Sequence, residues 1–236
     1  NGLPGLFAGM AVGVVISVIV AFLVGLPTLR LKGDYLAIAT LGVAEIIRVA
    51  VTNMKITNGA AGISGVPLTN TWTITYIALV LTTILILNYT FSSAGRATYA
   101  VLQDEIAAES MGVQVTKYKI LAFVLGAATA SIGGTLSATT LGAVTPSDFT
   151  FMKSIDVLII VVFGGIGSFT GSFVAAVLLG IINLVLQPFG QLRMIIYAVA
   201  LILIMIFRPG GLLGTWEFKL GDFKFSKKKE TKESGK

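Results

Sequence analysis

The feature that most constrains the fold is a run without a charged residue that begins almost at the start of the chain. It extends from Leu3 to Leu29, over 27 residues, with Pro27 near its end. About 20 apolar residues are enough for an α-helix to cross the hydrocarbon core of a bilayer. The run therefore predicts a membrane-spanning helix and places the chain among integral membrane proteins.

The composition of the whole chain supports this assignment. Of 236 residues, 55% are hydrophobic and 12% are charged, whereas a soluble globular domain has about 25% charged residues. The chain has no cysteine and no histidine, which excludes disulfides, Cys/His metal sites and catalysis by thiols or imidazoles. The net charge of +6 does not indicate nucleic-acid binding, because residues 208–236, with eight Lys/Arg and four Asp/Glu, contribute +4 of it. A basic tail beside a membrane helix is typical of a topology signal or an anionic-lipid contact.

Further apolar segments predict an all-α fold, a polytopic transmembrane helix bundle of about seven spans. After the first span, the predicted ones are 35–51, 72–91, 118–144, a short helix ending near 163, 172–186 and 194–207. The uncharged run 157–187 has 31 residues, so whether it crosses twice or partly re-enters stays open. Small residues at 126–134 predict close helix packing. We expect residues 1–215 to form one membrane domain and 216–236 a basic, disordered tail.

Lysine and arginine near the span ends predict the orientation. The positive-inside rule places the tail in the cytoplasm. With seven crossings, the basic residues of segments 30–32 and 96–119 also fall inside. Segments 57–67 and 145–156 fall outside, with Lys55 just before the first and Lys153 within the second. We therefore expect a multi-pass protein of a bacterial-type plasma (inner) membrane with a cytoplasmic C-terminus.

The stretch from Gly95 to Gly112 is the longest charged, helix-prone segment between apolar ones. Asp104 and Glu105 suit the positive end of a helix that starts near the middle of this stretch, and Gly112 suits its C′ position. Its narrow apolar stripe would consist of Leu102, Ile106 and Val113. We expect one short helix over 102–113, outside the bilayer on the cytoplasmic side, on which another protein acts.

Two charged residues lie inside a predicted span. Glu45 and Arg48 have i, i+3 spacing, so they can face each other on one side of a helix. Charged groups at membrane depth are rare and usually face a bundle interior or a water-filled path. Both side chains could instead extend to the interface from the end of the span, and the sequence leaves the two interpretations open.

The loop that follows, residues 57–67, contains Gly59, Gly62 and Gly65 at three-residue spacing. With Pro67, these glycines exclude a regular helix. Irregular backbone is tolerated at membrane depth only where it lines a cavity or is buried in protein. The loop could present amides and carbonyls to a passing solute, or it could be a plain connection. The three glycines and the charged pair are the candidates for a pathway.

Several motifs stand in one order along the chain. They are GDYLAIATL at 33–41, EIIR at 45–48, TNG and GISGVP within 57–67, DEIAAESMG at 104–112, VVFGGIGS at 161–168 and FRPGGLLG at 207–214. Together they resemble the permeases of ABC importers for branched-chain amino acids, LivM type. The resemblance covers nearly the whole chain, and family members have further membrane helices before the point where this chain begins.

The resemblance implies a permease subunit that translocates branched-chain or related amino acids by alternating access and is not itself an enzyme. It implies four kinds of partner: a related second permease subunit, two ATP-binding cassette subunits that bind ATP and Mg, an external substrate-binding protein and membrane lipid.

The resemblance also implies where the ATPase docks. In ABC importers a cytoplasmic loop with a Glu-Ala-Ala-then-Gly pattern contacts the ATPase. Ala107, Ala108 and Gly112 have the matching spacing, whereas Ile106 occupies the place of the glutamate and Glu105 lies one place earlier. With Asp104, these are the residues expected to couple the permease to its ATPase.

Two other functions fit a membrane bundle. A stand-alone secondary transporter or channel also uses helices interrupted by glycine, but it would require intramembrane acids for ion coupling, and only Glu45 lies well inside a span. A membrane enzyme would require clustered catalytic groups, which this composition does not provide.

Overall fold

The computed structural model describes residues 2–31, 33–68, 72–165 and 167–186, together with Val199, Ile202 and Gly211. Contacts divide the chain into two compact units, residues 1–151 and 152–236. The predicted span 194–207, apart from Val199 and Ile202, and the predicted tail 216–236 lie outside the described residues.

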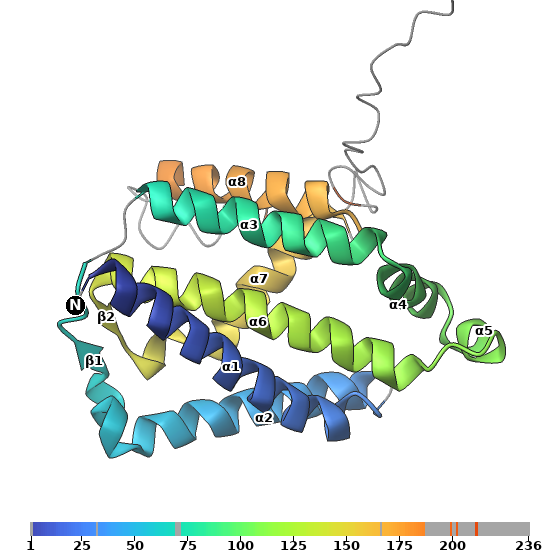
Figure 1. The fold of residues 1–236 in the computed structure, drawn as a ribbon, viewed down its shortest axis with the longest axis horizontal. Helices are drawn as coiled ribbons and strands as arrows, with labels where there is room; N and C mark the ends of the chain where they lie inside the picture. The colour runs from blue at the N-terminus through green and yellow to red at the C-terminus, as the bar shows by residue number, and fades with distance from the viewer. Residues whose placement is uncertain are drawn as a thin grey trace, which may run out of the picture. The chain divides into compact units, whose positions relative to one another are not determined.

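The first unit consists of long helices joined by short elements (Figure 1). Its long helices are α1 (Leu3–Thr28), α2 (Asp34–Asn53), α3 (Trp72–Phe91) and α6 (Val115–Leu141). Two shorter helices, α4 (Ser93–Gln103) and α5 (Glu105–Ser110), connect α3 to α6. The remaining elements are η1 (Lys55–Thr57), η2 (Gly59–Ala61), β1 (Ile63–Ser64), β2 (Ala143–Val144) and η3 (Pro146–Asp148).

The described part of the second unit contains α7 (Phe151–Gly164) and α8 (Phe169–Leu186). The two helices meet at a turn in which backbones are very close: a Cβ added to Gly164 would lie 2.5 Å from the Cα of Ser172. Ser168 begins α8, since its Oγ accepts a hydrogen bond of 3.0 Å from the Gly171 amide. Phe163, Ala175 and Leu179 form the buried core of the pair. The predicted short helix, glycine turn and second helix are therefore present.

The all-α membrane fold is confirmed. In the described part of the chain, five helices are long and apolar enough to span a bilayer: α1, α2, α3, α6 and α8. The count of seven spans is not established. Helix α7 has 14 residues, which corresponds to about 21 Å at 1.5 Å per residue, and a bilayer core is about 30 Å thick.

The segment 145–156, predicted to lie outside the membrane, is not wholly a connection, because α7 begins at Phe151. The reason lies in the short turn before it. The Thr145 hydroxyl donates to the Asp148 carboxylate at 2.6 Å, and the same carboxylate accepts from the Thr145 amide at 3.3 Å. This reciprocal cap completes the turn by Phe149, so the chain is free to start a helix two residues later.

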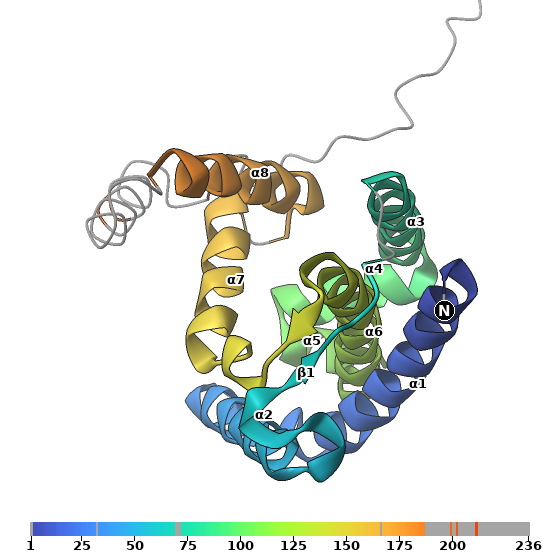
Figure 2. The ribbon, with the colours of Figure 1, turned by 90° about the vertical axis from the view of Figure 1, so that its left-hand side faces the viewer.

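Helices α1 and α6 pack side by side along most of their length (Figures 1 and 2). A Cβ added to Gly13 would lie 3.0 Å from the Ser131 Oγ, and one added to Gly25 would lie 3.3 Å from the Phe123 ring. Ser17 Oγ donates to the Ala127 carbonyl at 3.3 Å. Small residues let helices approach closely in lipid, where hydrophobicity does not drive association. The predicted packing face of α6 is therefore used, with glycines supplied by α1.

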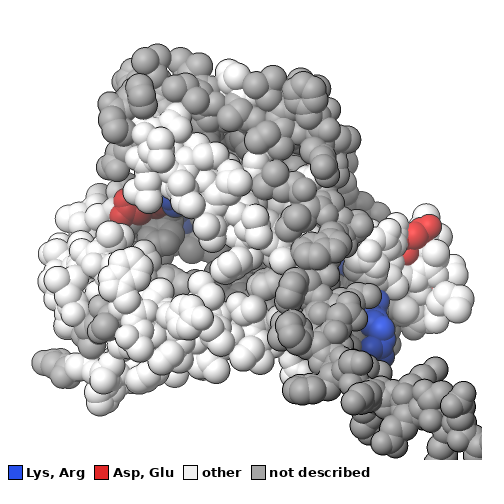
Figure 3. Space-filling view, turned by 90° about the horizontal axis from the view of Figure 1, so that it is seen from above, with Lys and Arg blue, Asp and Glu red and all other residues white. Residues whose placement is uncertain are grey.

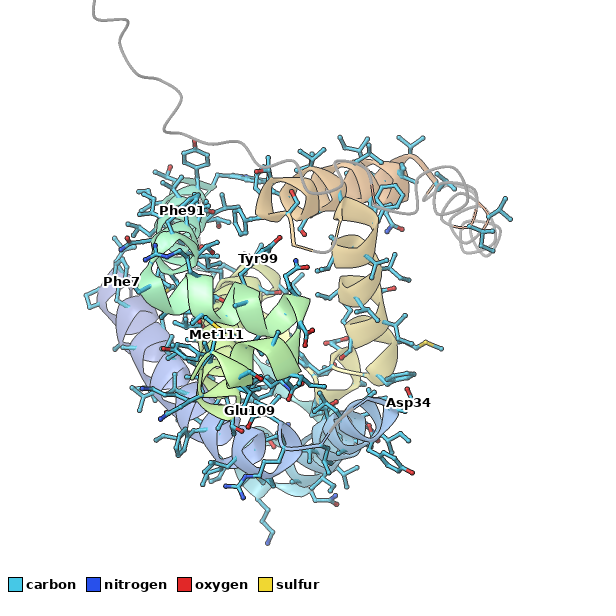
Figure 4. All side chains as sticks on the ribbon, turned by 90° about the vertical axis from the view of Figure 1, so that its right-hand side faces the viewer. Phe7, Asp34, Phe91, Tyr99, Glu109 and Met111 are labelled. Atoms are coloured by element: carbon cyan, nitrogen blue, oxygen red, sulfur yellow. The ribbon has the colours of Figure 1, made fainter. Side chains whose placement is uncertain are left out.

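The chain reverses direction with each long helix of the first unit, so its connections gather at two ends. The α5 end contains the end of α1, the starts of α2 and α6, the end of α3, and α4 and α5 (Figures 1 and 4). The β1 end contains the end of α2, η1, η2 and the β1–β2 pair (Figures 1 and 2). In the described part of this unit, the basic residues in the connections and first turns of the α5 end are Arg30, Arg96, Lys117 and Lys119, against Lys55 at the β1 end.

A two-residue antiparallel ladder closes the β1 end. Ile63 pairs with Val144 and Ser64 with Ala143, and the Val66 amide donates to the Gly142 carbonyl at 3.0 Å. The ladder ties the loop after α2 to the end of α6. Gly62 permits it, because a Cβ there would lie 2.2 Å from the Val144 carbonyl oxygen.

Gly62→Ala should destabilise the protein by clearly more than Gly65→Ala. Both glycines have positive φ, 73° and 77°, which costs an alanine about 1–2 kcal/mol. Only the alanine at 62 meets backbone, since nothing lies within 4 Å of a Cβ at Gly65. Thermal unfolding in detergent measures the difference, and equal losses for the two variants would contradict the close contact.

Candidate functional site

The predicted single helix over 102–113 is wrong: the chain breaks at Asp104, where φ is −155° and ψ is 111°. Helix α4 ends at Gln103, and α5 begins at Glu105. The break follows from the chemistry of Asp104. Its Oδ1 accepts from the Ile106 and Ala107 amides at 2.9 and 3.0 Å, so the carboxylate satisfies two amides that have no partner within a helix of their own.

Gly112 ends α5 as predicted. Its φ is +82°, and its amide donates to the Glu109 carbonyl at 2.9 Å. The next amide, that of Val113, donates to the Ala108 carbonyl at 3.0 Å. These two bonds form a Schellman motif, which requires a left-handed residue at the C′ position. Both ends of this six-residue helix are therefore fixed by specific hydrogen bonds.

The predicted apolar stripe is wrong for Leu102 and Ile106, because the buried residues at the α5 end are Val101, Ala108 and Val115; Val113, its third member, packs against them. Val101, Ala108 and Val115 follow one another at seven-residue spacing, and this spacing is the signal that would have identified them. The large apolar side chains here are exposed instead: Tyr99, Leu102, Ile106 and Met111. Ile106 is 74% exposed and Met111 is 85% exposed. We call these four residues the α5 apolar surface, and Figure 4 shows labelled Tyr99 and Met111 on the end that faces the viewer.

Of the other predicted coupling residues, Glu105 has a partner within the chain. Its Oε2 accepts from the Lys119 Nζ at 2.8 Å, which attaches the start of α5 to the first turns of α6. Ala108 is buried at 5% exposure, so it packs α5 and cannot contact a partner directly. Ala107, the other alanine, offers its amide to the Asp104 cap.

Charged side chains of both signs gather at the α5 end, and much of the described surface on the face shown in Figure 3 is uncharged. Arg96 donates to the Phe91 carbonyl and to the Ser93 Oγ, both at 3.1 Å. A groove of about 830 Å³ lies beside α5 between α1 and α6. Its walls are mostly apolar side chains, among them Phe22 of α1 and Val124 of α6, and Glu109 and Lys117 also line it. Among the described residues, no group of three or more Asp, Glu, His or Cys is placed to bind a metal.

Glu45 and Arg48 form the ion pair that their spacing allows. Arg48 Nε donates to Glu45 Oε2 at 2.9 Å, and Nη2 donates to Oε1 of the same carboxylate. The two side chains are 52% and 29% exposed, respectively, and α2 has no buried residue within the described structure. The pair therefore lies on a surface of a helix that has the composition of a membrane span.

The glycine loop is divided between two places. Gly59 lies against α2, since its added Cβ would be 3.2 Å from the Thr52 carbonyl oxygen. Thr52 in turn donates from Oγ1 to the Arg48 carbonyl at 2.8 Å. Gly62 and Gly65 instead flank β1, where backbone groups pair with residues 142–144. The structure thus places Gly59 against the end of α2, the helix that carries Glu45 and Arg48, and separates the other two glycines from it.

A second groove, of about 680 Å³, runs along the α1–α6 pair between the two ends. It is lined mostly by small and apolar residues of these helices, and Ile47 of α2 and Phe149 contribute to it. Its polar groups are hydroxyls, from Ser17, Ser131 and Thr135. None of the predicted pathway residues lines this groove, which is a feature that the sequence did not indicate.

Asp104→Ala should loosen α5 by about 1 kcal/mol, because an N-cap carboxylate that binds two amides is lost. The amides of residues 106 and 107 should then exchange with solvent about fivefold faster. Asp104→Asn is the matched control, since asparagine caps helices as well as aspartate does. Hydrogen exchange measured by mass spectrometry distinguishes the variants, and unchanged exchange in Asp104→Ala would show that the cap does not hold α5.

Comparison with known proteins gives a consistent match. The family model described as "Branched-chain amino acid transport system / permease component" matches residues 1–207. The permease protein LivM of a high-affinity branched-chain amino acid transport system in Salmonella typhimurium is 36% identical over 233 residues, which covers 84% of this chain and 55% of that protein. The chain is 30% identical to LivH of Escherichia coli K12 over 145 residues, 61% of this chain and 46% of LivH.

A similar protein is also found in an archaeon. A probable LivM of Methanocaldococcus jannaschii is 26% identical over 241 residues, with 86% of this chain and 68% of that protein covered. The chain spans about half the length of the bacterial relatives it matches. No solved structure matches.

Proposed function

Because this chain belongs to the branched-chain amino-acid transport permease family, we propose that it is a membrane-spanning subunit of an ATP-driven ABC importer for branched-chain or related amino acids. The chain is not itself the ATPase. Its partners would be a related second permease, two ATP-binding cassette subunits that bind ATP and Mg, and an external binding protein. The names LivM and LivH of its relatives support a pair of permeases within one transport system.

The α5 apolar surface is the observation that carries this proposal. Ile106 and Met111 of this surface are mostly exposed. Aliphatic and aromatic side chains that are grouped on an exposed surface are typical of protein contacts, so the α5 apolar surface fits a docking site for another protein better than a surface that stays in contact with water. The segment 102–113, predicted to couple to the ATPase, contains both residues. We therefore assign direct contact with the ATPase to the exposed apolar side chains, and a supporting role to Asp104, Glu105, Ala107, Ala108 and Gly112.

The structure of α5 suits the transmission of force to the membrane helices. Asp104 and Gly112 fix its two ends, and the Glu105–Lys119 ion pair attaches it to α6. A displacement of α5 by a closing ATPase would then move α6, and with it α1. Alternating access requires such a two-state displacement of packed helices.

The distribution of charge supports an orientation with the α5 end in the cytoplasm. In the connections and first turns of the described first unit, four basic residues lie at that end and Lys55 at the β1 end. Cytoplasmic connections carry the excess of lysine and arginine. The β1–β2 pair would then face the external binding protein.

Ile106→Asp should weaken binding of the ATPase subunits about tenfold or more, because an apolar side chain central to an interface is replaced by a charge. Ile56→Asp is the matched control, since Ile56 is 88% exposed in η1 at the opposite end. Co-purification of the ATPase with each variant, together with ATP-dependent uptake of leucine, measures the effect. Equal ATPase binding in both variants would contradict docking on α5.

Energy coupling separates this function from a stand-alone secondary transporter. Uptake by the complete system should stop when ATP is depleted, and it should continue when ion gradients are dissipated while ATP is maintained. Uptake that survives ATP depletion and collapses with the ion gradient would instead favour the secondary transporter.

A further inference from the structure

The Glu45–Arg48 pair lies deep within a membrane span. Glu45 is eleven residues after Asp34, the first residue of α2, so it lies about 16 Å along a helix of about 30 Å. A charge at this depth is costly unless it faces protein or water. The Arg48 guanidinium is held toward Glu45, because two of its nitrogens bind that carboxylate. The pair therefore needs a polar environment at the middle of the bilayer.

Glu45 lies on the side of α2 that faces away from α1 and α6. At 100° per residue, Glu45 and Ile47 lie about 160° apart around α2. Ile47 lines the groove along α1 and α6, so Glu45 lies on the opposite face. Leu41 and Val49, each about 40° from Glu45, are 39% and 44% exposed. We call this the Glu45 face, and Glu45, Leu41 and Val49 on it each keep more than a third of their surface exposed in the described structure.

The Glu45 face leads toward the β1 end. Thr52 lies one turn beyond Arg48 and donates to its carbonyl, and Gly59 packs against the carbonyl of Thr52. Charged and small residues thus follow one another along the helix, from mid-membrane to the glycine loop. A solute that moved along this face would meet the ion pair halfway across the bilayer.

We propose that the Glu45 face lines a water-filled translocation path, and that Glu45 and Arg48 bind the ammonium and carboxylate groups of the amino acid in transit. This proposal rests on the proposed function, since it requires that the solute is an amino acid. A zwitterion can replace both contacts of the pair at once: its ammonium binds Glu45 and its carboxylate binds Arg48. Pair and solute are each neutral overall, so the exchange leaves no unpaired charge in the membrane.

The pair also fits this chemistry by residue type. Arginine binds carboxylates through two parallel hydrogen bonds, and its guanidinium already makes two such bonds to Glu45. The same geometry is available to the carboxylate of an α-amino acid. The branched side chain would lie against the apolar neighbours on the same face, Leu41 and Val49.

Single-cysteine variants in the assembled importer test whether water reaches the Glu45 face. They are straightforward to interpret because this chain has no cysteine of its own. Leu41→Cys and Val49→Cys should react with a water-soluble methanethiosulfonate reagent, and transport of saturating leucine should slow the reaction. Ile46→Cys is the matched control for Leu41→Cys: Ile46 is 67% exposed but lies about 140° from Leu41 around the helix, and it should react about tenfold more slowly than Leu41→Cys. Equal reactivity at the three positions, or cross-linking of 41 and 49 to the second permease, would overturn the proposal.

Neutralising the pair tests its chemical role. Glu45→Gln and Arg48→Gln each leave one charge unpaired, and both should impair uptake whatever the pair does. The double variant Glu45→Gln/Arg48→Gln removes both charges, so a purely structural pair would regain uptake. A pair that binds the solute would not, and leucine uptake should stay at least about tenfold below that of the unchanged importer, since two charged contacts are lost.

The two proposals fail in different ways. If the unchanged importer shows no ATP-dependent uptake of branched-chain amino acids, the proposed function fails. If it transports leucine normally and the double variant does so equally well, only the role of the ion pair fails. Co-purification of the ATPase subunits with the double variant confirms that the complex has assembled.

Discussion

The close approach of α1 and α6 is the interaction on which the first unit depends. Between lipid-embedded helices, association is driven by packing and by polar contacts, since lipid is as apolar as the side chains. Gly13 and Gly25 bring α1 near the Ser131 and Phe123 side chains of α6, and the Ser17 hydroxyl adds a hydrogen bond to the α6 backbone. The other long helices of this unit make fewer contacts, and α2 in particular has no buried residue in the described structure.

Because α6 is packed closely against α1, the elements attached to its two ends determine which displacements the first unit can transmit. At its start, Val115 belongs to the buried cluster with Val101 and Ala108, and Lys119 binds Glu105. Helix α5 is too short to be stable alone, so these contacts and its two caps define its position. Helix α5 is thus held as a rigid extension of α6, the longest helix among the described residues.

The sequence predicts the helices well and their junctions less well, for physical reasons. An uncharged run such as Leu3–Leu29 has one solution in a bilayer, because every backbone polar group must be satisfied within the helix. At Asp104 the local signals are ambiguous: an aspartate is equally favourable in the first turn of a helix and as the residue that caps it. The capping choice breaks the predicted helix, and this turns Leu102 and Ile106 outward while Val101 and Ala108 are buried.

In the candidate site too, local contacts could be predicted from the sequence and contacts between elements could not. The i, i+3 spacing of Glu45 and Arg48 was enough to predict their pairing, because helix geometry is local. The partner of Glu105 was not predictable, since Lys119 lies in another helix and its approach depends on how α5 folds. The β1–β2 ladder was missed for a similar reason: two residues on each side carry no periodic pattern, and the glycines that permit it suggested only irregular backbone.

The ladder gives the two candidate sites a physical connection within the first unit. Helix α6 carries α5 at one end and β2 just beyond the other, and β2 pairs with β1. The loop that contains β1 follows directly from α2, and Gly59 of that loop packs on Thr52, one turn from Arg48. In the proposed mechanism, a displacement of α5 would therefore reach the Glu45–Arg48 pair through α6 and the ladder. Elements held by backbone hydrogen bonds and close glycine contacts have little freedom to absorb such a displacement, so the ion pair would move with the helix that the ATPase moves.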